Sequence, residues 1–291
     1  MAWFLIGSLV LPIIKLFDMK KILVPTDFSK SSHNALNYAV ELARETGAEL
    51  YLLHVYSIPV FAEDSVLITT EEFLKEDALS NLEDLKQPID QSNPELTITY
   101  TTLPGTAVEI IQEYAKKQHI DLIVMGSQGV GYLQERILGS TTSTLIRKTS
   151  IPVMVIDKKV KFRKPKNIVL AVDFSETDNE TILKPLKQLT KTFQSHICVL
   201  NVFTEAEIIP TFSEIAESFR IEKALKHTYH TFFEVEHPDV VTGINDFVKK
   251  HHIDLVTVIS RDHSLIGRIF REPVSKAMSF HSLTPLLILH E

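Results

Sequence analysis

Short apolar runs alternate along the chain with longer segments of helical periodicity. The unbroken apolar stretches at 22–24 and 50–55 are typical of strands buried on both faces. Between them alanine and leucine recur at helical spacing, with Ser29 as the expected N-cap and Gly47 as the expected C-terminal stop. The predicted elements that follow are a helix within 63–85 over the exit of the second strand, a strand at 96–103, a helix at 106–118, a strand at 120–125, a helix at 140–149 and a strand at 151–156. This alternation predicts an α/β fold with a parallel sheet covered by helices on both faces.

The chain also contains an internal duplication. The segment 20–56 opens with an apolar run and Asp-Phe-Ser and closes with a second apolar run, and 166–203 repeats that order. The sequence KKQHIDLIVM is echoed by KKHHIDLVTV, and Pro185 is expected to kink or shorten the first helix of the second copy. The basic stretch KKVKFRKPK between the copies is short, so a linker is favoured over a nucleic-acid patch. The expected organisation is an apolar leader at 1–18, a first domain at 19–157, a linker at 158–165 and a second domain at 166–291.

Composition narrows the class of protein. The length of 291 residues suits two domains of about 150 residues, and the net charge of −7 argues against general attraction to nucleic acid or anionic membrane. The single cysteine, Cys198, excludes an intrachain disulfide framework and fits a reducing compartment, so we expect a cytoplasmic protein. Pro12 and Lys15 interrupt the apolar leader, which is shorter than the ~20 residues of a spanning helix. A dispensable leader is therefore favoured over a membrane anchor.

Two loops are equipped to bind a ligand, which in a doubly wound sheet lies beyond the carboxyl ends of the strands. The first loop follows the first strand and contains Pro25, Thr26 and Asp27, whose carboxylate would accept hydrogen bonds from a ribose or a base. The second follows the 120–125 strand in a Gly-x2-Gly-x9-Gly-Ser pattern: Gly126, Gly129, Gly139, Ser140, Thr141 and Thr142.

The second loop has two interpretations. The first two glycines are able to adopt positive φ and let the backbone touch a ligand, and the third leads into hydroxyl residues at a helix start. The N–H groups and partial positive charge of a helix start suit a phosphate chain. The alternative is a glycine turn made only for packing of helix on strand. The Walker A pattern is absent, and Gly129-Val130-Gly131 lacks the third glycine of the Rossmann fingerprint.

The first copy resembles a universal stress protein domain of the ATP-binding type (UspA-like). The resemblance covers 19–157 and is carried by ILVPTDFS, LLHVY, DLIVMGSQG, the glycine spacing and IPVMVI. The whole chain is similar to the tandem form of that family. The resemblance implies two tandem doubly wound five-stranded parallel sheets, each in the strand order 3-2-1-4-5, packed as a pseudo-dimer. It also implies pairing of domains through the edge strands, which IPVMVI and TPLLIL would satisfy internally, and homo-oligomers formed through edge strands.

The resemblance implies a ligand and roles for the site residues. The ligand would be ATP, ADP or AMP, with Mg²⁺ accompanying the nucleotide. Pro25, Thr26 and Asp27 would line the adenine and ribose end, Val55 would pack on the base, and Met125 and Gly126 would border ribose and phosphates. The phosphate chain would be held through backbone and hydroxyl donors by the rest of the set: Gly129, Gly139, Ser140, Thr141 and Thr142. Ser127 and Gln128 would either touch phosphate or face water.

The second copy departs from this pattern. It keeps Asp173 after its first strand, but Gly267 stands alone. The positions of the expected glycines and of the helix start hold other residues: Ile259, Asp262, Arg271, Glu272 and Pro273. We therefore expect nucleotide in the first domain only.

Three functions remain open at this stage. The leading one is an ATP-binding regulatory protein of the stress response that acts on an unidentified protein partner. The others are a slow ATPase or phosphotransferase, and an interaction scaffold with structural nucleotide. No catalytic residue is assigned, because no Ser-His-Asp order or nucleophile elbow is found. The twelve histidines are interpreted as surface residues and not as metal ligands, and His54 as a hydrogen-bonded core residue.

Overall fold

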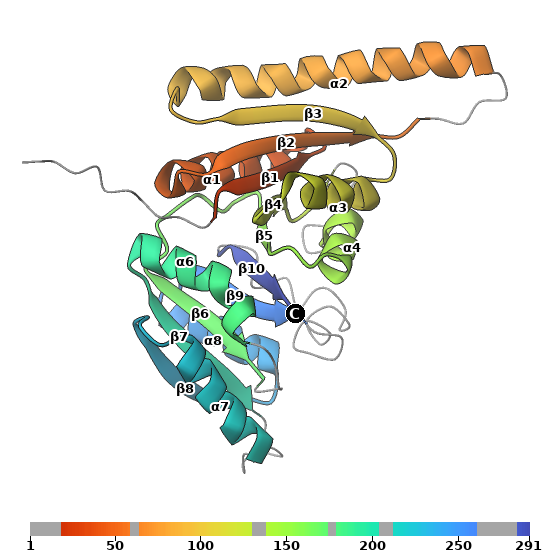
Figure 1. Ribbon diagram of the computed structural model, residues 1–291. Coiled ribbons are helices and arrows are strands. Elements are labelled where there is room, and N and C mark those ends of the chain that lie inside the picture. The colour runs from red at the N-terminus through yellow and green to blue at the C-terminus, as the bar shows by residue number, and fades with distance from the viewer. Residues whose placement is uncertain (1–18, 59–63, 130–137, 174–178, 204–211, 261–283) are drawn as a thin grey trace, which may run out of the picture.

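The computed structural model describes residues 19–58, 64–129, 138–173, 179–203, 212–260 and 284–291 (Figure 1). The first half contains β1 (Lys21–Thr26), α1 (Lys30–Thr46), β2 (Glu49–Tyr56), α2 (Asp64–Ser92), β3 (Ile98–Pro104), α3 (Ala107–Gln118), β4 (Leu122–Gly126), α4 (Ser140–Lys148) and β5 (Val153–Ile156). The second half contains β6 (Asn167–Val172), α5 (Asn179–Ile182), α6 (Lys184–Phe193), β7 (His196–Phe203), α7 (Phe212–Ala224), β8 (His230–Glu236), α8 (Val240–Lys250), β9 (Leu255–Ser260) and β10 (Leu286–His290).

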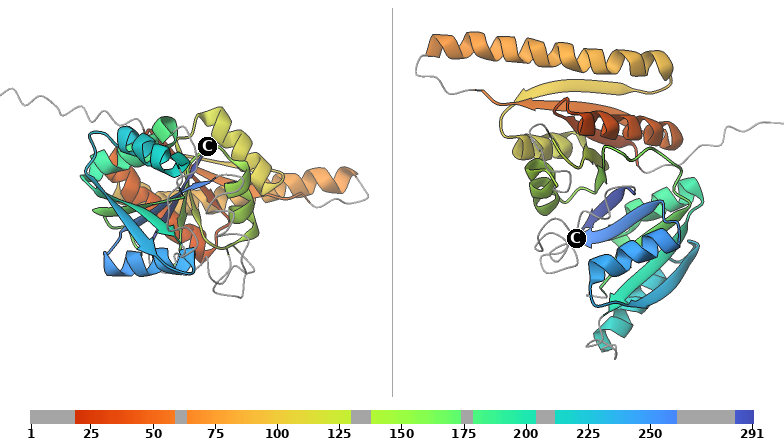
Figure 2. Two further views of the ribbon diagram at one scale, coloured as in Figure 1. Left: turned by 90° about the horizontal axis from the view of Figure 1, so that it is seen from below. Right: turned by 180° about the vertical axis from the view of Figure 1, so that it is seen from behind.

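The strands of both halves join into one ten-stranded sheet. Its order is β3-β2-β1-β4-β5-β10-β9-β6-β7-β8, so each half has the predicted order 3-2-1-4-5. Pairing within each half is parallel, whereas β5 and β10 pair antiparallel, with Leu287 opposite Met154. The predicted internal pairing of these two edge strands is confirmed. The outer strands are β3 and β8, and Figures 1 and 2 show them at opposite ends of the molecule.

Local sequence signals explain where α1 begins and ends. The Ser29 side chain accepts a hydrogen bond from the Ser32 N–H, as an N-cap does. Gly47 ends the helix with φ 74°, in the left-handed region, and its N–H donates to the Ala43 carbonyl. Both predicted boundary residues therefore act as expected.

The repeated Ile-Asp-Leu motif has the same structural role in each half. The Asp121 carboxylate accepts hydrogen bonds from the N–H groups of Lys20 and Lys21 at 2.8 and 3.0 Å. In the second half Asp254 accepts from Lys166 and Asn167, both at 2.9 Å. Each aspartate thus fixes the start of the first strand of its own half.

Two helices differ in extent from the simplest expectation. The helical segment in the second half is divided by Pro185, because α5 ends at Ile182 and α6 begins at Lys184 with the proline in its first turn. Helix α2 continues to Ser92 and packs along β3 and β2, so it covers more than the exit of the second strand. Its buried Leu82 belongs to the core on that face of the sheet.

The hydrophobic core runs through both halves. On one face of the sheet, Leu122 and Met154 of the first half share a buried cluster with Leu170 and Leu287 of the second. The other face has a second cluster, which includes residues of α3, α4 and α8. Among the residues that the structure describes, no helix combines the length and apolarity needed to cross a bilayer. The predicted leader, 1–18, lies outside the described residues.

Candidate functional site

A cavity of about 290 Å³ opens at the carboxyl ends of β1 and β4, beside the first turns of α3 and α4. It lies at the point where the sheet order reverses, since β1 is followed on one side by β2 and on the other by β4. All eleven residues predicted for the site line it: Pro25, Thr26, Asp27, Val55, Met125, Gly126, Gly129, Gly139, Ser140, Thr141 and Thr142. Residues more than 100 positions apart in the chain therefore meet at one place.

The loop after β1 holds the carboxylate of the cavity in place. Asp27 accepts a hydrogen bond at Oδ1 from the Ser29 N–H, at 3.1 Å. The Thr26 hydroxyl donates to Ser32 Oγ and accepts from the Phe28 N–H, each at 3.1 Å. Phe28 has φ 61°, a strained left-handed conformation for an aromatic residue. This tight turn presents Asp27 to the cavity from the N-terminal end of α1.

The first two glycines of the second loop are required by close packing. A Cβ at Gly126 would lie 2.5 Å from Ser31 Oγ and 2.8 Å from the Ser31 carbonyl carbon. A Cβ at Gly129 would lie 2.5 Å from Asp27 Oδ2. Neither glycine has a positive φ, so the expectation that these positions use the left-handed region is wrong. Glycine is present there because the β4 loop lies against α1 and the β1 loop.

Gly139 differs from the other two glycines. It is the N-cap of α4, with φ −58° and ψ 149°, and its N–H donates to the Ser127 carbonyl at 2.8 Å. A Cβ added there would come no closer than 3.5 Å to any atom, which is ordinary van der Waals contact. Gly139 has no side chain that could cap the helix, and Ser140, Thr141 and Thr142 of its first turn line the cavity.

Two hydroxyls of this region are used within the protein. The Thr142 hydroxyl donates to the Gly126 carbonyl at 3.0 Å and ties α4 to the end of β4. In this structure the hydroxyl proton is therefore donated within the protein, and the predicted contact of Thr142 with phosphate stays a prediction. Ser127 is buried and donates to Asp157 Oδ2 at 3.2 Å, so it neither touches a ligand nor faces water. Gln128 lines the cavity, and its N–H bonds to Ser31 Oγ at 3.3 Å.

Four residues line the cavity that the sequence did not point to: Ser32, Leu53, Ala107 and Ile111. Leu53 lies two positions before Val55 on β2, and a period of two places both side chains on one face. Ala107 and Ile111 are four apart on α3 and share a helix face. These two periodicities are the signals that would have identified them. Among the described lining residues there is no lysine or arginine, and Asp27 is the only carboxylate.

A second, more open hollow of about 630 Å³ adjoins the first. The two share Ala107, Ser140 and Thr141, so they meet at the first turns of α3 and α4. Gly105, with φ 138°, and the Thr106 N-cap of α3 belong to the second hollow. Together they provide a continuous space along the start of α4.

The corresponding region of the second half is described in part. Ile259 is buried at the end of β9, where the first half has Gly126, and its side chain belongs to the core. Asp173 is half-buried after β6. The remaining positions singled out there lie outside the described residues: Asp262, Gly267, Arg271, Glu272 and Pro273.

Histidines do not form a metal centre in the described part of the chain. No group of three or more His, Cys, Asp or Glu residues there is arranged to hold a metal ion. His54 bonds through Nδ1 to the Thr26 carbonyl at 2.8 Å and packs against the Phe28 ring, as expected for a hydrogen-bonded core residue.

Comparison with known proteins identifies the family. The model of the universal stress protein family matches residues 19–157 and 164–290. The chain belongs to the universal stress protein family. Two domain-length matches make it a tandem member. The universal stress protein MJ0531 of Methanocaldococcus jannaschii is 34% identical over 146 residues, 49% of this chain and 84% of that protein. The universal stress protein YxiE of Bacillus subtilis is 32% identical over 146 residues, 47% of this chain and 97% of that protein.

A solved structure shares the tandem architecture. The crystal structure of a universal stress protein from Archaeoglobus fulgidus covers 94% of this chain and 98% of its own, with a TM-score of 0.68. At 16% identity this likeness concerns the fold. The two universal stress protein domains therefore form a known arrangement of two doubly wound units in one chain.

Proposed function

We propose that this tandem universal stress protein binds an adenine nucleotide in its first domain and that occupancy of the site regulates binding of a protein partner in the stress response. The observation that carries the proposal is the cavity beside the start of α4, lined by all eleven residues of the ATP-binding pattern. The backbone N–H groups and the partial positive charge of a helix start suit the phosphates of such a ligand.

The chemistry of the cavity fits a nucleotide at both ends. The apolar wall of Leu53, Val55 and Met125 suits a base, and the Asp27 carboxylate accepts hydrogen bonds from base or ribose donors. At the other end Gly129, Gly139 and the first turn of α4 offer backbone donors. Mg²⁺ would be held by the phosphates and water, because the carboxylate of the described lining belongs to the base end. The ion would supply neutralisation of phosphate charge.

The helix at the phosphate end also contacts the second domain, which supports a regulatory role. His290 of β10 hydrogen-bonds through Nε2 to the Ile146 carbonyl of α4, at 2.8 Å. A shift of α4 on nucleotide binding would therefore change its contact with β10 at the junction between the domains. In this way occupancy of one domain alters the surface that the whole chain presents.

Rapid phosphoryl transfer is not favoured by the described residues. Such catalysis neutralises charge on the transferred phosphoryl group with lysine, arginine or metal and positions the attacking water. The described lining has no cationic side chain. We expect ATP turnover well below about 1 s⁻¹, the lower end of ordinary enzyme rates. A faster, metal-dependent rate that Ser140→Asp abolishes would instead support the ATPase or phosphotransferase alternative.

Titration calorimetry with ATP tests the proposal directly. We expect one site per chain, because the second half has Ile259 at the chain position where the glycine pattern of the first half has Gly126. Ser140→Asp should abolish binding, since its carboxylate would repel phosphate at the start of α4. Two equivalent sites would contradict the assignment to one domain, and no affinity at millimolar ATP would refute the proposal. Mass spectrometry of gently purified protein would identify any nucleotide that co-purifies.

Partner capture separates regulation from a scaffold role. A regulatory protein should hold its partner differently with and without ATP, and Ser140→Asp should remove that difference. A scaffold should bind the same partner to the same extent in both forms. Equal binding in the wild type, with and without ATP, would refute the regulatory part of the proposal.

A further inference from the structure

The linker between the two domains is packed into the fold at its first half. Asn34 of α1 donates from Nδ2 to the carbonyls of Asp157 and Val160, both at 2.7 Å. Val160 is buried, and the Phe162 ring packs edge-on against Tyr38, with ring centroids 5.1 Å apart. These contacts hold the linker backbone on one path.

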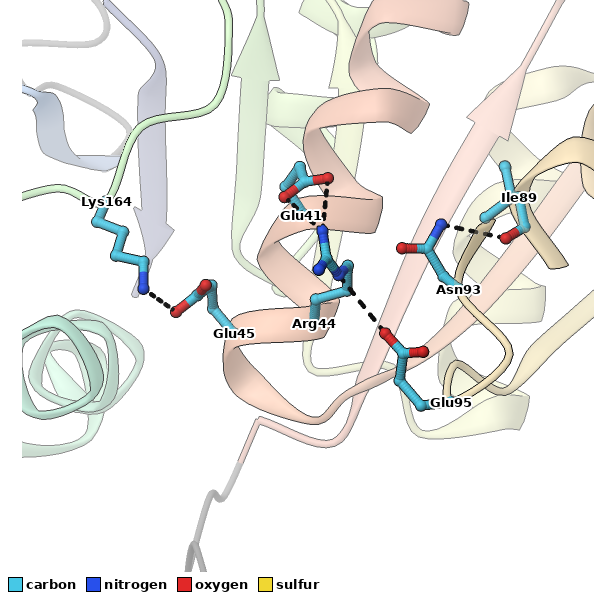
Figure 3. A network of polar contacts seen from close by, with 7 residues as sticks. All are labelled: Glu41, Arg44, Glu45, Ile89, Asn93, Glu95 and Lys164. Carbon is cyan, nitrogen blue, oxygen red and sulfur yellow. Dashed lines mark hydrogen bonds and ion pairs between the residues drawn. The ribbon is translucent and has the colours of Figure 1, made fainter. Parts of the chain in front are cut away.

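The second half of the linker is fixed from both domains. Lys164 forms an ion pair with Glu45 of α1 at 2.7 Å, beside the Arg44 contacts of the same helix (Figure 3). Lys166 donates from Nζ to the Phe193 carbonyl at 2.7 Å. Two of the six cationic side chains in the stretch KKVKFRKPK, at 158–166, are thereby engaged.

Three other cations face away from these anchors. Lys159, Lys161 and Arg163 alternate with the packed Val160 and Phe162, and all three are exposed. Lys159 lies in the turn at 158–159, and in the irregular stretch that follows it Lys161 and Arg163 are alternate residues, which in an extended chain lie on one side roughly 6–7 Å apart. None of the three has an ion-pair partner among the residues that the structure describes. The chain as a whole carries a charge of −7, so this row is a local concentration of positive charge.

The three cations line one hollow of about 380 Å³ at the junction between the domains. Its other walls are Val160, Tyr38 of α1 and the residues that precede two strands of the second domain: Ile253, Asp254 and Pro285. The Asp254 carboxylate faces the backbone N–H groups of Lys166 and Asn167, which offset part of its charge. Burial, followed by the charge of Asp254, raises the pKa of Tyr38, so its phenol keeps its proton.

We propose that this hollow binds a small anion that carries two or more phosphate groups. Three cations along one hollow match several phosphates better than one, and a hollow of about 380 Å³ has room for a small molecule. The proposal is independent of nucleotide binding in the first domain, because the two sites share no lining residue. A single-stranded nucleic acid is the competing polyanion, and the test includes it.

Calorimetry on the full chain, with inorganic triphosphate as the probe and ATP present at saturation, tests the site. We expect one triphosphate per chain at 50 mM NaCl, with affinity that falls as salt rises. Lys161→Gln and Arg163→Gln should each weaken binding roughly 3- to 10-fold, as loss of one partly exposed charged contact does. Lys223→Gln on α7 makes the same change of charge at a residue that does not line the hollow, and it should leave binding unchanged. Asp254→Asn should strengthen it, provided that its melting temperature matches the wild type.

The outcomes separate this site from the nucleotide site. The proposal would be overturned if triphosphate competed with ATP and bound the linker variants as tightly as the wild type. It would also be overturned if millimolar triphosphate did not bind at all. If Lys223→Gln weakened binding as much as the linker variants do, the effect would come from the net charge of the protein, and a specific site at the hollow would be refuted. Tighter binding of a six-nucleotide single strand than of triphosphate would show that the partner class is wrong. If ATP fails to bind while triphosphate binding depends on Lys161 and Arg163, the function proposed for the first domain fails and this site stands.

Discussion

Replacing Gly139 by alanine separates a ligand role for this glycine from a packing role. The backbone there has φ −58° and ψ 149°, a conformation open to any residue, and an added Cβ meets its nearest atoms at 3.5 Å. Alanine is a poorer N-cap than glycine by some tenths of a kcal/mol, but it also restricts the unfolded chain by about 0.4–1 kcal/mol. We therefore expect the free energy of unfolding of Gly139→Ala to stay within about 1 kcal/mol of the wild type.

The effect on ATP should be much larger. The new methyl group would stand between Gly129 and the start of α4, where phosphate oxygens must approach backbone N–H groups. Loss of one charged hydrogen bond costs about 1.5–3 kcal/mol, which corresponds to a roughly 10- to 150-fold weaker association. Titration calorimetry with ATP and thermal unfolding of the same sample measure the two quantities separately.

Two other glycines are the controls. Gly126→Ala would bring a Cβ within 2.8 Å of the Ser31 backbone and should destabilise the fold by about 1–3 kcal/mol. Gly47→Ala, at φ 74° and remote from the cavity, should cost about 1 kcal/mol and leave ATP affinity unchanged. Wild-type ATP affinity in Gly139→Ala would refute the reasoning, because it would show that no phosphate is seated against this position.

The other predictions concern the fold around the site. Phe162→Ala should lower the free energy of unfolding by about 2–3 kcal/mol in urea titration, since the ring packs between Tyr38 and Phe193; an unchanged midpoint would contradict a packed linker. Burial lowers the pKa of His290 in the folded protein, so as the pH falls the unfolded chain takes up this proton before the folded chain does. The free energy of unfolding should therefore be highest above about pH 6.5 and decrease as the pH falls below that value. His290→Gln should make this decrease smaller. Thr142→Val should lower the free energy of unfolding by about 1–2 kcal/mol, because the Gly126 carbonyl loses the hydroxyl that bonds to it. A melting temperature equal to that of the wild type would contradict this.

The sequence predicts the fold more completely than it predicts why individual residues occupy their positions. Apolar runs and helical spacing locate the elements of the first half, and the resemblance to the tandem family implies the β5–β10 pairing. Gly126 and Gly129 are also found correctly as special positions, but the predicted cause, positive φ, is wrong. The actual cause is contact with Ser31 and Asp27, about 100 residues away in the chain. Such contacts depend on how α1 and β4 pack, which no local pattern records.

The same limit applies to the cavity walls. A hydroxyl at a helix start is a sound candidate for phosphate, yet the Thr142 hydroxyl bonds to the Gly126 carbonyl. The Thr142 hydroxyl holds α4 against β4 through this bond. Which acceptor lies nearest to the hydroxyl depends on how the two elements pack, and the sequence does not record that. Leu53 and Ile111 were missed for a different reason, since apolar residues on a strand or helix look alike whether they face a core or a cavity.

The β5–β10 pairing gives the second domain a structural role that needs no ligand of its own. A single domain of this fold ends in β5, whose unpaired edge is a template for association with other strands. Here β10 covers that edge, and β10 also carries His290, which bonds to the Ile146 carbonyl of α4. Neither contact requires a ligand in the second domain. The second half therefore supports the first domain through its closing strand, whether or not it binds a ligand of its own.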